Sequence, residues 1–417
     1  MSDFQLPNEF ETQTLTIDGN DVSGLMVSLS VFENIYTPLV TGHVTLVEAD
    51  SAKFIEKYKI EGVEKFECQF KTGDSDYKFE GYLNGLRNKA NDQAKTMYTF
   101  DFTTEEVRKN EETFITKAYR DKQPKDIVQD MIDKMGGKQD KVQGQGIPMT
   151  MLPCNKRPYD VIKYVLRHGV SDESNASEGE VDKVEEKSEG NGGFMCWATV
   201  DGFRFNTIEK VMKGQAGGDA GEYKSQMMNK GQGLSEMMKS IVSYDFQIMG
   251  DFQAKLRSGA FTSKMFLFDI DKLHYKEYMY DNTDKAGKKM KEFIDAEKPT
   301  RLFNVAFSNE RFMNDCNKAQ QQKYDLRKKF TQQTPGGENT SDDAQGTVTL
   351  YPSCKIRAGD KITLKIGKVD DNEYDKKTSG KYICSEVAHH FSSVTSHAYT
   401  RVSLIRATDQ QDDSSSN

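Results

Sequence analysis

The sequence predicts an α+β protein that is built around two similar antiparallel β-barrel units, with helical and mixed α/β insertions. Short segments with alternating apolar residues near both ends of the chain predict the strands. Two helical patterns lie between these segments. The order of the strand-like segments near the start is repeated near the end, which predicts that the two units are related.

Residues 12–104 have the pattern of a β-rich unit. Apolar residues occur at nearly alternate positions, and Gly, Asn, Asp or Pro separates the segments. The segments are 25–32, 42–47, 65–71, 77–86 and 97–102. Several short strands with turn signals between them indicate a barrel or a sandwich.

The hydrophobic period changes after residue 104. Residues 123–135 place their apolar side chains on one helical face, and Gly136-Gly137 ends that pattern. Residues 157–168 form a second helical pattern, and Pro158 suits its first turn. The sequence therefore predicts a helical insert between the two β units.

The second half of the chain is predicted to be mixed, and then β again. Strands are expected at 194–199, 203–212, 241–249, 264–270, 273–280 and within 347–407, with a charged helix at 308–329. Asp201-Gly202 is a hairpin signal between the first two of these strands. Polar, Gly-rich or acidic segments predict loops at 171–193, 213–233 and 331–346.

These patterns predict a domain division. The first β-barrel domain spans 1–108, and a helical insert that ends in an acidic flexible loop spans 109–193. The second β-barrel domain is discontinuous, at 194–235 and 345–407, and a peripheral α/β insert spans 236–344. Residues 408–417 are expected to form a disordered tail.

The two β ends share a run of similar residues. In each, Gly, an acidic residue and Lys lead into an alternating strand, a strand with Gly and Tyr follows, and a closing strand carries a Tyr-Thr pair. The matched positions are Gly62, Lys65, Tyr82, Tyr98 and Thr99 in the first unit, and Gly359, Lys361, Tyr382, Tyr399 and Thr400 in the second. The alternative is that any two three-stranded meanders look alike, because alternation is generic. If the repeat is real, a closed homotrimer would display pseudo-sixfold symmetry.

Composition and charge exclude several functional classes. The net charge of −8 argues against a general nucleic-acid binder, which needs clustered Lys and Arg. No segment has the pattern of a signal peptide, and no apolar run approaches the ~20 residues that span a bilayer. The six cysteines are scattered and never in C-x-x-C spacing, so we expect free thiols in a reducing compartment.

No motif indicates catalysis, and we expect no enzyme activity and no cofactor. The chain lacks G-x-S-x-G, H-E-x-x-H, P-loop and G-x-G-x-x-G patterns. His389 and His390 are adjacent on a predicted strand and so point to opposite faces. His390 and His397 are the candidate metal ligands, since they could face each other across the last hairpin, but a zinc site needs three or four ligands. Ordinary cross-strand packing is the favoured interpretation.

The order of these segments resembles the central hub protein of contractile-tail (myovirus) phage baseplates. That family is related to the N-terminal hub part of type VI secretion spike proteins. The residues that carry the resemblance lie at 350–362, 380–389 and 399–406, at 79–82 and 98–102, and in the helical insert at 122–128 and 157–162. The acidic segment 171–193 departs from the family pattern.

The resemblance implies a virion protein of the tail baseplate that is assembled in the host cytoplasm. It implies a homotrimeric ring with tube-type barrels that joins the sixfold tail tube, or a tube-initiator protein, to the trimeric tail spike. The tape-measure protein and the surrounding baseplate wedge proteins are the other implied partners. DNA would pass through the ring during ejection without specific binding, so we expect an acidic or polar channel.

Two other functions remain open. The chain could be the hub of another contractile injection system. In a different class, it could be a tail-associated module that binds carbohydrate or degrades peptidoglycan. An open groove lined with Trp and Tyr would favour that class, but Trp197 is the only tryptophan.

Overall fold

The structure is a computed structural model of the 417-residue chain. It describes residues 6–49, 53–73, 75–92, 95–146, 148–169, 171, 193–225, 233–247, 253, 256–257, 262–269, 274–281, 293–294, 298–307, 345–367, 374–375 and 377–407.

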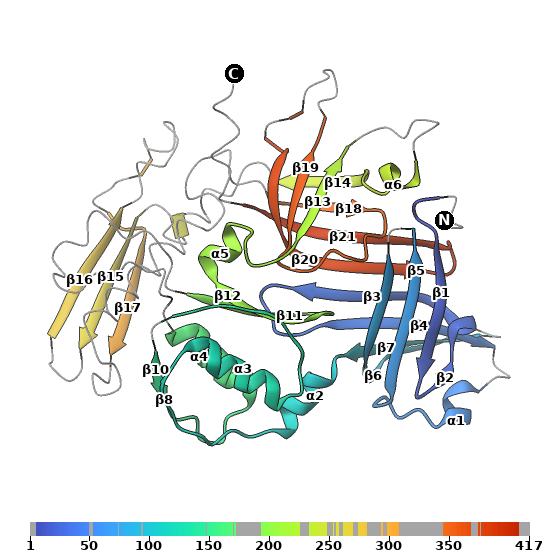
Figure 1. Ribbon diagram of the computed structural model, residues 1–417, viewed down its shortest axis with the longest axis horizontal. Helices are drawn as coiled ribbons and strands as arrows, with labels where there is room; N and C mark the ends of the chain where they lie inside the picture. Colours follow the sequence, from blue (N-terminus) through green and yellow to red (C-terminus); the bar gives the residue numbers. More distant parts are fainter. Residues whose placement is uncertain are drawn as a thin grey trace.

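A 13-stranded, mostly antiparallel sheet forms the centre of the molecule (Figure 1). Its strands, in spatial order, are β14 (Ile241–Gln247), β18 (Gln345–Leu350), β21 (His397–Arg406), β20 (Gly380–Ser392), β3 (Met26–Asn34), β4 (Thr41–Ala49), β7 (Lys95–Thr103), β6 (Asp76–Asp92), β5 (Lys65–Thr72), β1 (Phe10–Ile17) and β2 (Asn20–Asp21). A branch leaves this path at β20, which pairs with β19 (Lys361–Lys365), and β19 pairs in parallel with β13 (Asp219–Lys224). The sheet therefore runs continuously from the N-terminal half of the chain into the C-terminal half.

Alternation of side chains decides which face of this sheet is buried. In β5, Phe66, Cys68 and Phe70 are buried, and the residues between them are not. Phe391 of β20 stacks on Phe70 with ring centroids 4.3 Å apart, so β5 curls over the core face of the C-terminal strands. The predicted strands of residues 25–102 are confirmed, although β6 continues to Asp92.

A layer of helices and short strands packs on the core side. It contains α2 (Glu105–Glu112), α3 (Pro124–Lys134), α4 (Pro158–His168), the sheet β11 (Phe194–Thr199), β12 (Gly202–Thr207) and β9 (Gln139–Val142), and the pair β10 (Met149–Met151) and β8 (Tyr119–Lys122). Both helices predicted for the insert, at 123–135 and 157–168, are confirmed as α3 and α4, each with proline in its first turn and a buried apolar face. The Asp201-Gly202 turn is confirmed as well, since β11 and β12 form an antiparallel hairpin around it.

Two expectations for residues 203–233 are wrong. The strand predicted at 203–212 ends at Thr207 and continues as the short helix α5 (Ile208–Met212). The segment predicted as a loop at 213–233 contains β13, whose partner β19 lies far away in the sequence. Local patterns do not contain such a distant pairing, which explains the second error.

The remaining elements lie at the periphery. A three-stranded sheet of β16 (His274–Asp281), β15 (Thr262–Asp269) and β17 (Arg301–Phe307) stands beside the main sheet (Figure 1). The short helices are η1 (Ser23–Leu25), α1 (Phe54–Tyr58) and α6 (Leu234–Met237). The helix predicted at 308–329 and the tail 408–417 lie outside the described residues, as do most of the loops predicted at 171–193 and 331–346.

The observed fold is mostly antiparallel β with few helices, and its largest sheet is curled. Within the described residues the halves share this sheet and do not close into separate barrels. Among the same residues, no helix is long and apolar enough to cross a membrane.

Candidate assembly surface

The two halves of the large sheet have the same strand order. In the first half the order is β5-β6-β7-β4-β3, and in the second half it is β19-β20-β21-β18-β14. Every neighbouring pair in both series is antiparallel. Each strand of one half therefore has a counterpart at the same place in the other half.

Details of register repeat as well. Both β4 and β18 contain the pattern Gly-x-Val-Thr-Leu, at residues 42–46 and 346–350. The ladder shifts by one residue between Met26 and Ser28 of β3, and it shifts at the corresponding place between Ile241 and Ser243 of β14. A second shared shift lies at residues 83–85 of β6 and 384–386 of β20. Bulges at matched positions are not expected of unrelated meanders.

The positions that were matched from the sequence lie in or beside these strands. Lys65 pairs with Tyr82, but Lys361 pairs with Ile383 and not with Tyr382. Tyr98 is buried and Thr99 is half-buried, whereas Tyr399 is half-buried and Thr400 is buried. In the second unit, each residue matched by its letter thus lies one position away from the residue that the strand pairing matches. The shared Gly-x-Val-Thr-Leu pattern, which the sequence analysis missed, is in phase.

Both glycines of the matched set have left-handed backbone. Gly62 has φ +91° and Gly359 has φ +86°, where residues with a side chain are strained. At Gly359 an added Cβ would lie 2.5 Å from the Trp197 ring. Gly359 is therefore needed both for the turn and for close packing.

The halves meet where β20 pairs with β3. Their ladder runs from Glu386 opposite Asn34 to Ser392 opposite Ser28. The core-side residues of this junction are fully buried, with Leu29 and Val31 at 0% exposure and Phe391 at 1%. We call this ladder the internal junction.

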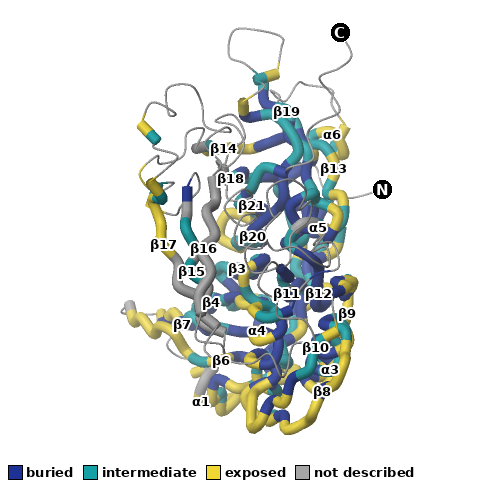
Figure 2. The backbone as a smooth tube through the Cα atoms, turned by 90° about the vertical axis from the view of Figure 1, so that its left-hand side faces the viewer, coloured by how far each residue is buried: buried dark blue, intermediate teal, exposed yellow. Residues whose placement is uncertain are grey.

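The outer edges of the repeated strands have no such partner in the described part of the chain. β5 pairs with β6 only as far as Tyr82, so the edge of β6 from Gly85 to Asp92 is open. The other open edge belongs to β14, whose one partner among the described strands is β18. Figure 2 shows the β6 and β7 end projecting with exposed residues. Leu86 and Tyr244, on these two edges, are 44% and 46% exposed. We call these edges the open ends.

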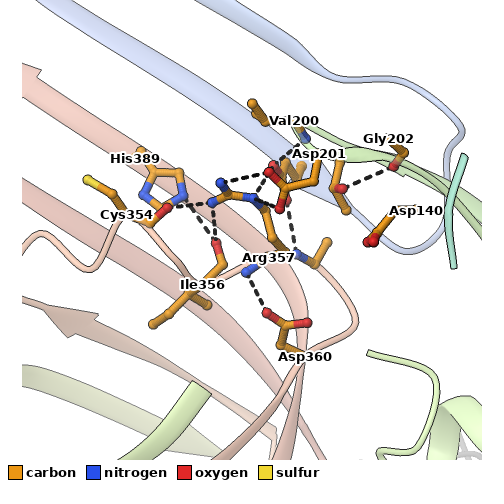
Figure 3. Close-up of polar contacts among 12 residues, drawn as sticks. Asp140, Val200, Asp201, Gly202, Cys354, Ile356, Arg357, Asp360 and His389 are labelled. Atoms are coloured by element: carbon orange, nitrogen blue, oxygen red, sulfur yellow. Dashed lines mark hydrogen bonds and ion pairs between the residues drawn. The ribbon is translucent and has the colours of Figure 1, made fainter. Parts of the chain in front are cut away.

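A buried ionic cluster ties the internal junction to the helical layer (Figure 3). Glu33 of β3 has no exposed side-chain surface, and its carboxylate accepts N–H bonds from Val200 at 2.9 Å and from Ala358 at 3.0 Å. Burial raises the pKa of Glu33, while Arg357 and the two N–H donors oppose this rise. One side chain thus links the first half, the β11–β12 turn and the second half.

Two arginines complete this cluster. Arg357 donates to Asp201 at 2.7 Å and to the carbonyl oxygen of Cys354 at 2.6 Å. Arg204 of β12 is 4% exposed and donates to Asp140 of β9 at 2.6 Å and to Asp360 at 2.8 Å. Burial would lower the pKa of Arg204, but the two aspartates outweigh burial and raise it. A paired and hydrogen-bonded cluster of this kind fixes geometry and offers no vacant group for chemistry.

His389 of β20 lies on the core side beside this cluster. Its Nδ1 lies 3.1 Å from the Thr400 hydroxyl, and its Nε2 lies 3.3 Å from the carbonyl oxygen of Ile356. Thr400 in turn accepts the Ser353 N–H at 3.0 Å. Burial, followed by the charge of Arg357, lowers the pKa of His389 to about 3. The neutral ring therefore serves as a structural hydrogen-bonding group.

The candidate metal ligands are not directly opposite each other. His390 pairs with Tyr399, and His397 pairs with Ser392. The Nδ1 of His390 lies 2.8 Å from the Ser30 hydroxyl across the internal junction. Among the described residues, no group of three or more His, Cys, Asp or Glu is placed to hold a metal ion. As expected from alternation, His389 and His390 point to opposite faces, one buried and one half-buried.

The single tryptophan is not available to stack on a sugar. Trp197 is fully buried, and its indole N–H donates to the carbonyl oxygen of Ala358 at 2.9 Å. The five described cysteines form no disulfide with one another, and Cys154 is the one among them that is exposed.

Comparisons with known proteins give a likeness of fold. No family model matches the chain, and no curated protein matches it. Among solved structures, the 43 kDa tail protein of prophage MuSo2 from Shewanella oneidensis superposes with a TM-score of 0.54 at 11% identity, over 95% of this chain and 98% of that one. The tail protein from Neisseria meningitidis MC58 gives 0.54 at 8% identity, over 95% and 96%.

A component of the E. coli type VI secretion system, described as similar to T4 phage tail proteins, gives a TM-score of 0.46 at 8% identity, over 96% of this chain and 77% of that one. This third likeness is too distant to add to the other two. At such identities the likeness concerns the fold alone. The fold of this chain is like that of phage tail proteins, which agrees with the resemblance found in its sequence.

Proposed function

We propose that this chain is a structural, non-enzymatic component of a phage tail baseplate. In this proposal it is the central hub, a homotrimeric ring with pseudo-sixfold symmetry that joins the sixfold tail tube to the trimeric spike. The observation that carries the proposal is the repeated strand order in one curled sheet with two open ends. The fold likeness to two phage tail proteins supports it.

The repeat bears directly on symmetry. A chain with two equivalent units can present six similar positions in a ring of three copies, and closed rings are the usual result of repeated head-to-tail contacts. The sequence-based domain division is kept as part of the proposal. One change is that β14 (Ile241–Gln247) counts with the second tube-type unit, since it occupies the place that β3 has in the first.

The face of the large sheet that points away from the core is proposed to line the channel. Half-buried residues with hydroxyl groups are spread over this face: Ser28, Thr45, Thr99, Thr347, Thr349 and Ser403. Its charged residues have both signs, such as Arg401 and Glu386. Such a wall lacks the clustered cations that retain DNA, so DNA and the tape-measure protein would pass without specific binding.

The decisive experiment is a mass measurement in solution of the purified chain, alone and co-expressed with the trimeric spike protein of the same genome. We expect a trimer that binds the spike, and the spike stabilises the trimer if the ring is weak alone. A chain that stays monomeric and does not bind the spike contradicts the proposal. Capsid and terminase genes beside the gene distinguish a phage from another contractile injection system.

The competing enzymatic or carbohydrate-binding function has a separate test. The buried Trp197 argues against a sugar-stacking groove. Purified chain, with no spike present, is incubated with peptidoglycan, and release of soluble fragments is measured. Release above the level of heat-denatured protein contradicts a purely structural role.

A further inference from the structure

The internal junction contains the geometry of a contact that the open ends lack. β3 has the same place in the first half that β14 has in the second, because both are the last strand of their series and carry the same bulge. β20 has the same place that β6 has, because each follows the first strand of its series and carries the bulge at residues 384–386 or 83–85. β6 has one further shift, between Leu86 and Asn88, that β20 lacks. Beyond that shift, from Asn88 to Asp92, an edge equivalent to that of β20 is open in β6, and a strand equivalent to β3 is open in β14.

Exposure at matched positions indicates what is missing. Leu29 of β3 is 0% exposed, and its counterpart Tyr244 of β14 is 46% exposed. Val387 of β20 is 1% exposed, and its counterpart Leu86 of β6 is 44% exposed. Open strand edges with apolar side chains are templates for pairing with another chain. The strand that fits the open edge of β6 is β14 of a second copy, and the strand that fits the open edge of β14 is β6 of a second copy.

We infer that residues 88–92 of β6 pair, antiparallel, with β14 of a neighbouring copy of this chain, with Ala90 opposite Asp245. This inference rests on the proposed ring and specifies its interface. The register follows from the internal junction, where His390 lies opposite Ser30. His390 corresponds to Ala90 because their partners, Tyr399 of β21 and Met97 of β7, have the same place in the two halves. Ser30 corresponds to Asp245 because their partners, His43 of β4 and Thr347 of β18, have the same place in the pattern Gly-x-Val-Thr-Leu.

The same template predicts the hydrogen-bonding pattern. The Ile35 N–H donates to Ser385, and the Ser393 N–H donates to Val27, both at 3.0 Å. Hydrogen-bonded pairs alternate with non-hydrogen-bonded pairs in such a ladder, so His390 and Ser30 form a non-hydrogen-bonded pair. Ala90 and the neighbour's Asp245 inherit this position. There the Cα atoms come to about 4.5 Å, a spacing that a disulfide can bridge.

Charge and exposure are compatible with this pairing. Arg87, Lys89 and Lys95 lie exposed on the β6–β7 hairpin, whereas β14 exposes Asp245. Ala90 and Asp245 are both exposed in the single chain, so replacing them leaves its core untouched.

The test is disulfide trapping. Cys154→Ser and Cys316→Ser are first introduced to remove competing thiols, and Ala90→Cys is then combined with Asp245→Cys. After mild oxidation, a non-reducing gel should show a species of three chain masses that a reductant returns to one. A matched control combines Ala90→Cys with Ser243→Cys, which is exposed on the same face but two residues out of register. We expect it to crosslink about tenfold less, since disulfide geometry is narrow.

Two measurements on the same samples separate the outcomes. Trp197 fluorescence reports that each variant is folded, and light scattering gives the mass before oxidation. A trimer that does not crosslink through Ala90 and Asp245, or that crosslinks equally through Ser243, overturns the register while the proposed ring stands. A ladder of open-ended products overturns closure at three. A chain that stays monomeric and uncrosslinked even when it is co-expressed with the trimeric spike, and that does not bind the spike, overturns the interface and the proposed function together.

Discussion

The internal junction and the open ends are formed by equivalent strands. At the internal junction these strands pair with each other, and at the open ends they lack a partner among the described strands. In both, the β3-type strand carries a bulge near its start and pairs with a Gly-x-Val-Thr-Leu strand. At the internal junction the β20 ladder and the ionic cluster around Glu33 cover the core-side residues. At the open ends, matched side chains remain nearly half exposed. Burial in this protein therefore depends on which strand lies beside a residue more than on the residue's own strand.

The largest expected difference concerns two arginines. Arg204→Met leaves the Asp360 carboxylate buried without its ion pair, so we expect a loss of about 3–5 kcal/mol in the free energy of unfolding. Arg87→Met breaks the Arg87–Asp101 pair near the β6 open end, where Arg87 is 59% exposed, and should cost about 1 kcal/mol or less. Urea unfolding followed by Trp197 fluorescence measures both. Equal losses would mean that the cluster does not secure the junction.

A second comparison uses matched apolar positions. Leu29→Ala opens a cavity in the core and should cost about 2–5 kcal/mol. Tyr244→Ala, at the same place in β14, should change the stability of the isolated chain by about 0.5 kcal/mol or less. Tyr244→Ala should instead weaken association, read as a lower trimer fraction in light scattering. A large loss of monomer stability from Tyr244→Ala would contradict the equivalence of the two ends.

The third comparison concerns pH. The pKa of His389 is lowered to about 3 in the folded chain, so between that pH and about 6.5 the unfolded chain binds more protons. Stability that is present above about pH 6.5 is lost as the pH falls, by about 2–3 kcal/mol at pH 4.5. His389→Gln should reduce this loss of stability, measured as the fall in melting temperature from pH 7 to 4.5. The matched change at the open end, Lys89→Gln, should leave that fall in melting temperature unaltered.

The smallest expected difference concerns the glycines of the repeated pattern. A Cβ at Gly42 would lie 2.2 Å from Phe102 and 2.5 Å from the Ser30 carbonyl oxygen, both inside a complete sheet. We expect Gly42→Ala to cost about 1–3 kcal/mol. At Gly346 a Cβ would lie 2.4 Å from Phe246 and 2.8 Å from the Asp245 carbonyl oxygen, both on β14, whose one partner among the described strands is β18. Gly346→Ala should cost under about 1 kcal/mol, and chemical denaturation of both variants checks the order.

Much of the fold could be predicted from local patterns. Alternation predicted β3 to β7, and the helical period with a proline in the first turn predicted α3 and α4. The end of β12 at Thr207 was missed because Phe203, Phe205 and Val211 continue the apolar series into α5. The pairing of β13 with β19 joins segments far apart in the chain, and no local pattern contains it.

The candidate assembly surface was predicted only in outline. The repeat was recognised, but it was matched by residue letter, and Tyr98 of β7 and Tyr399 of β21 share a letter while only Tyr98 faces the core. The ionic cluster could not be foreseen, because Glu33, Arg204 and Arg357 are brought together by three separate parts of the chain.

One hairpin of the repeat differs from its counterpart in a way that bears on how such a protein changes over time. Residues 35–40 join β3 to β4, whereas residues 248–344 separate β14 from β18, and the β15–β17 sheet lies within that span. Since the flanking strands still pair in register, the hairpin accommodates a long insertion without disturbing its ladder. New sequence can be gained, lost or exchanged at this point while the paired strands are kept, so lineages can diversify the peripheral β15–β17 sheet and inherit the large sheet unaltered.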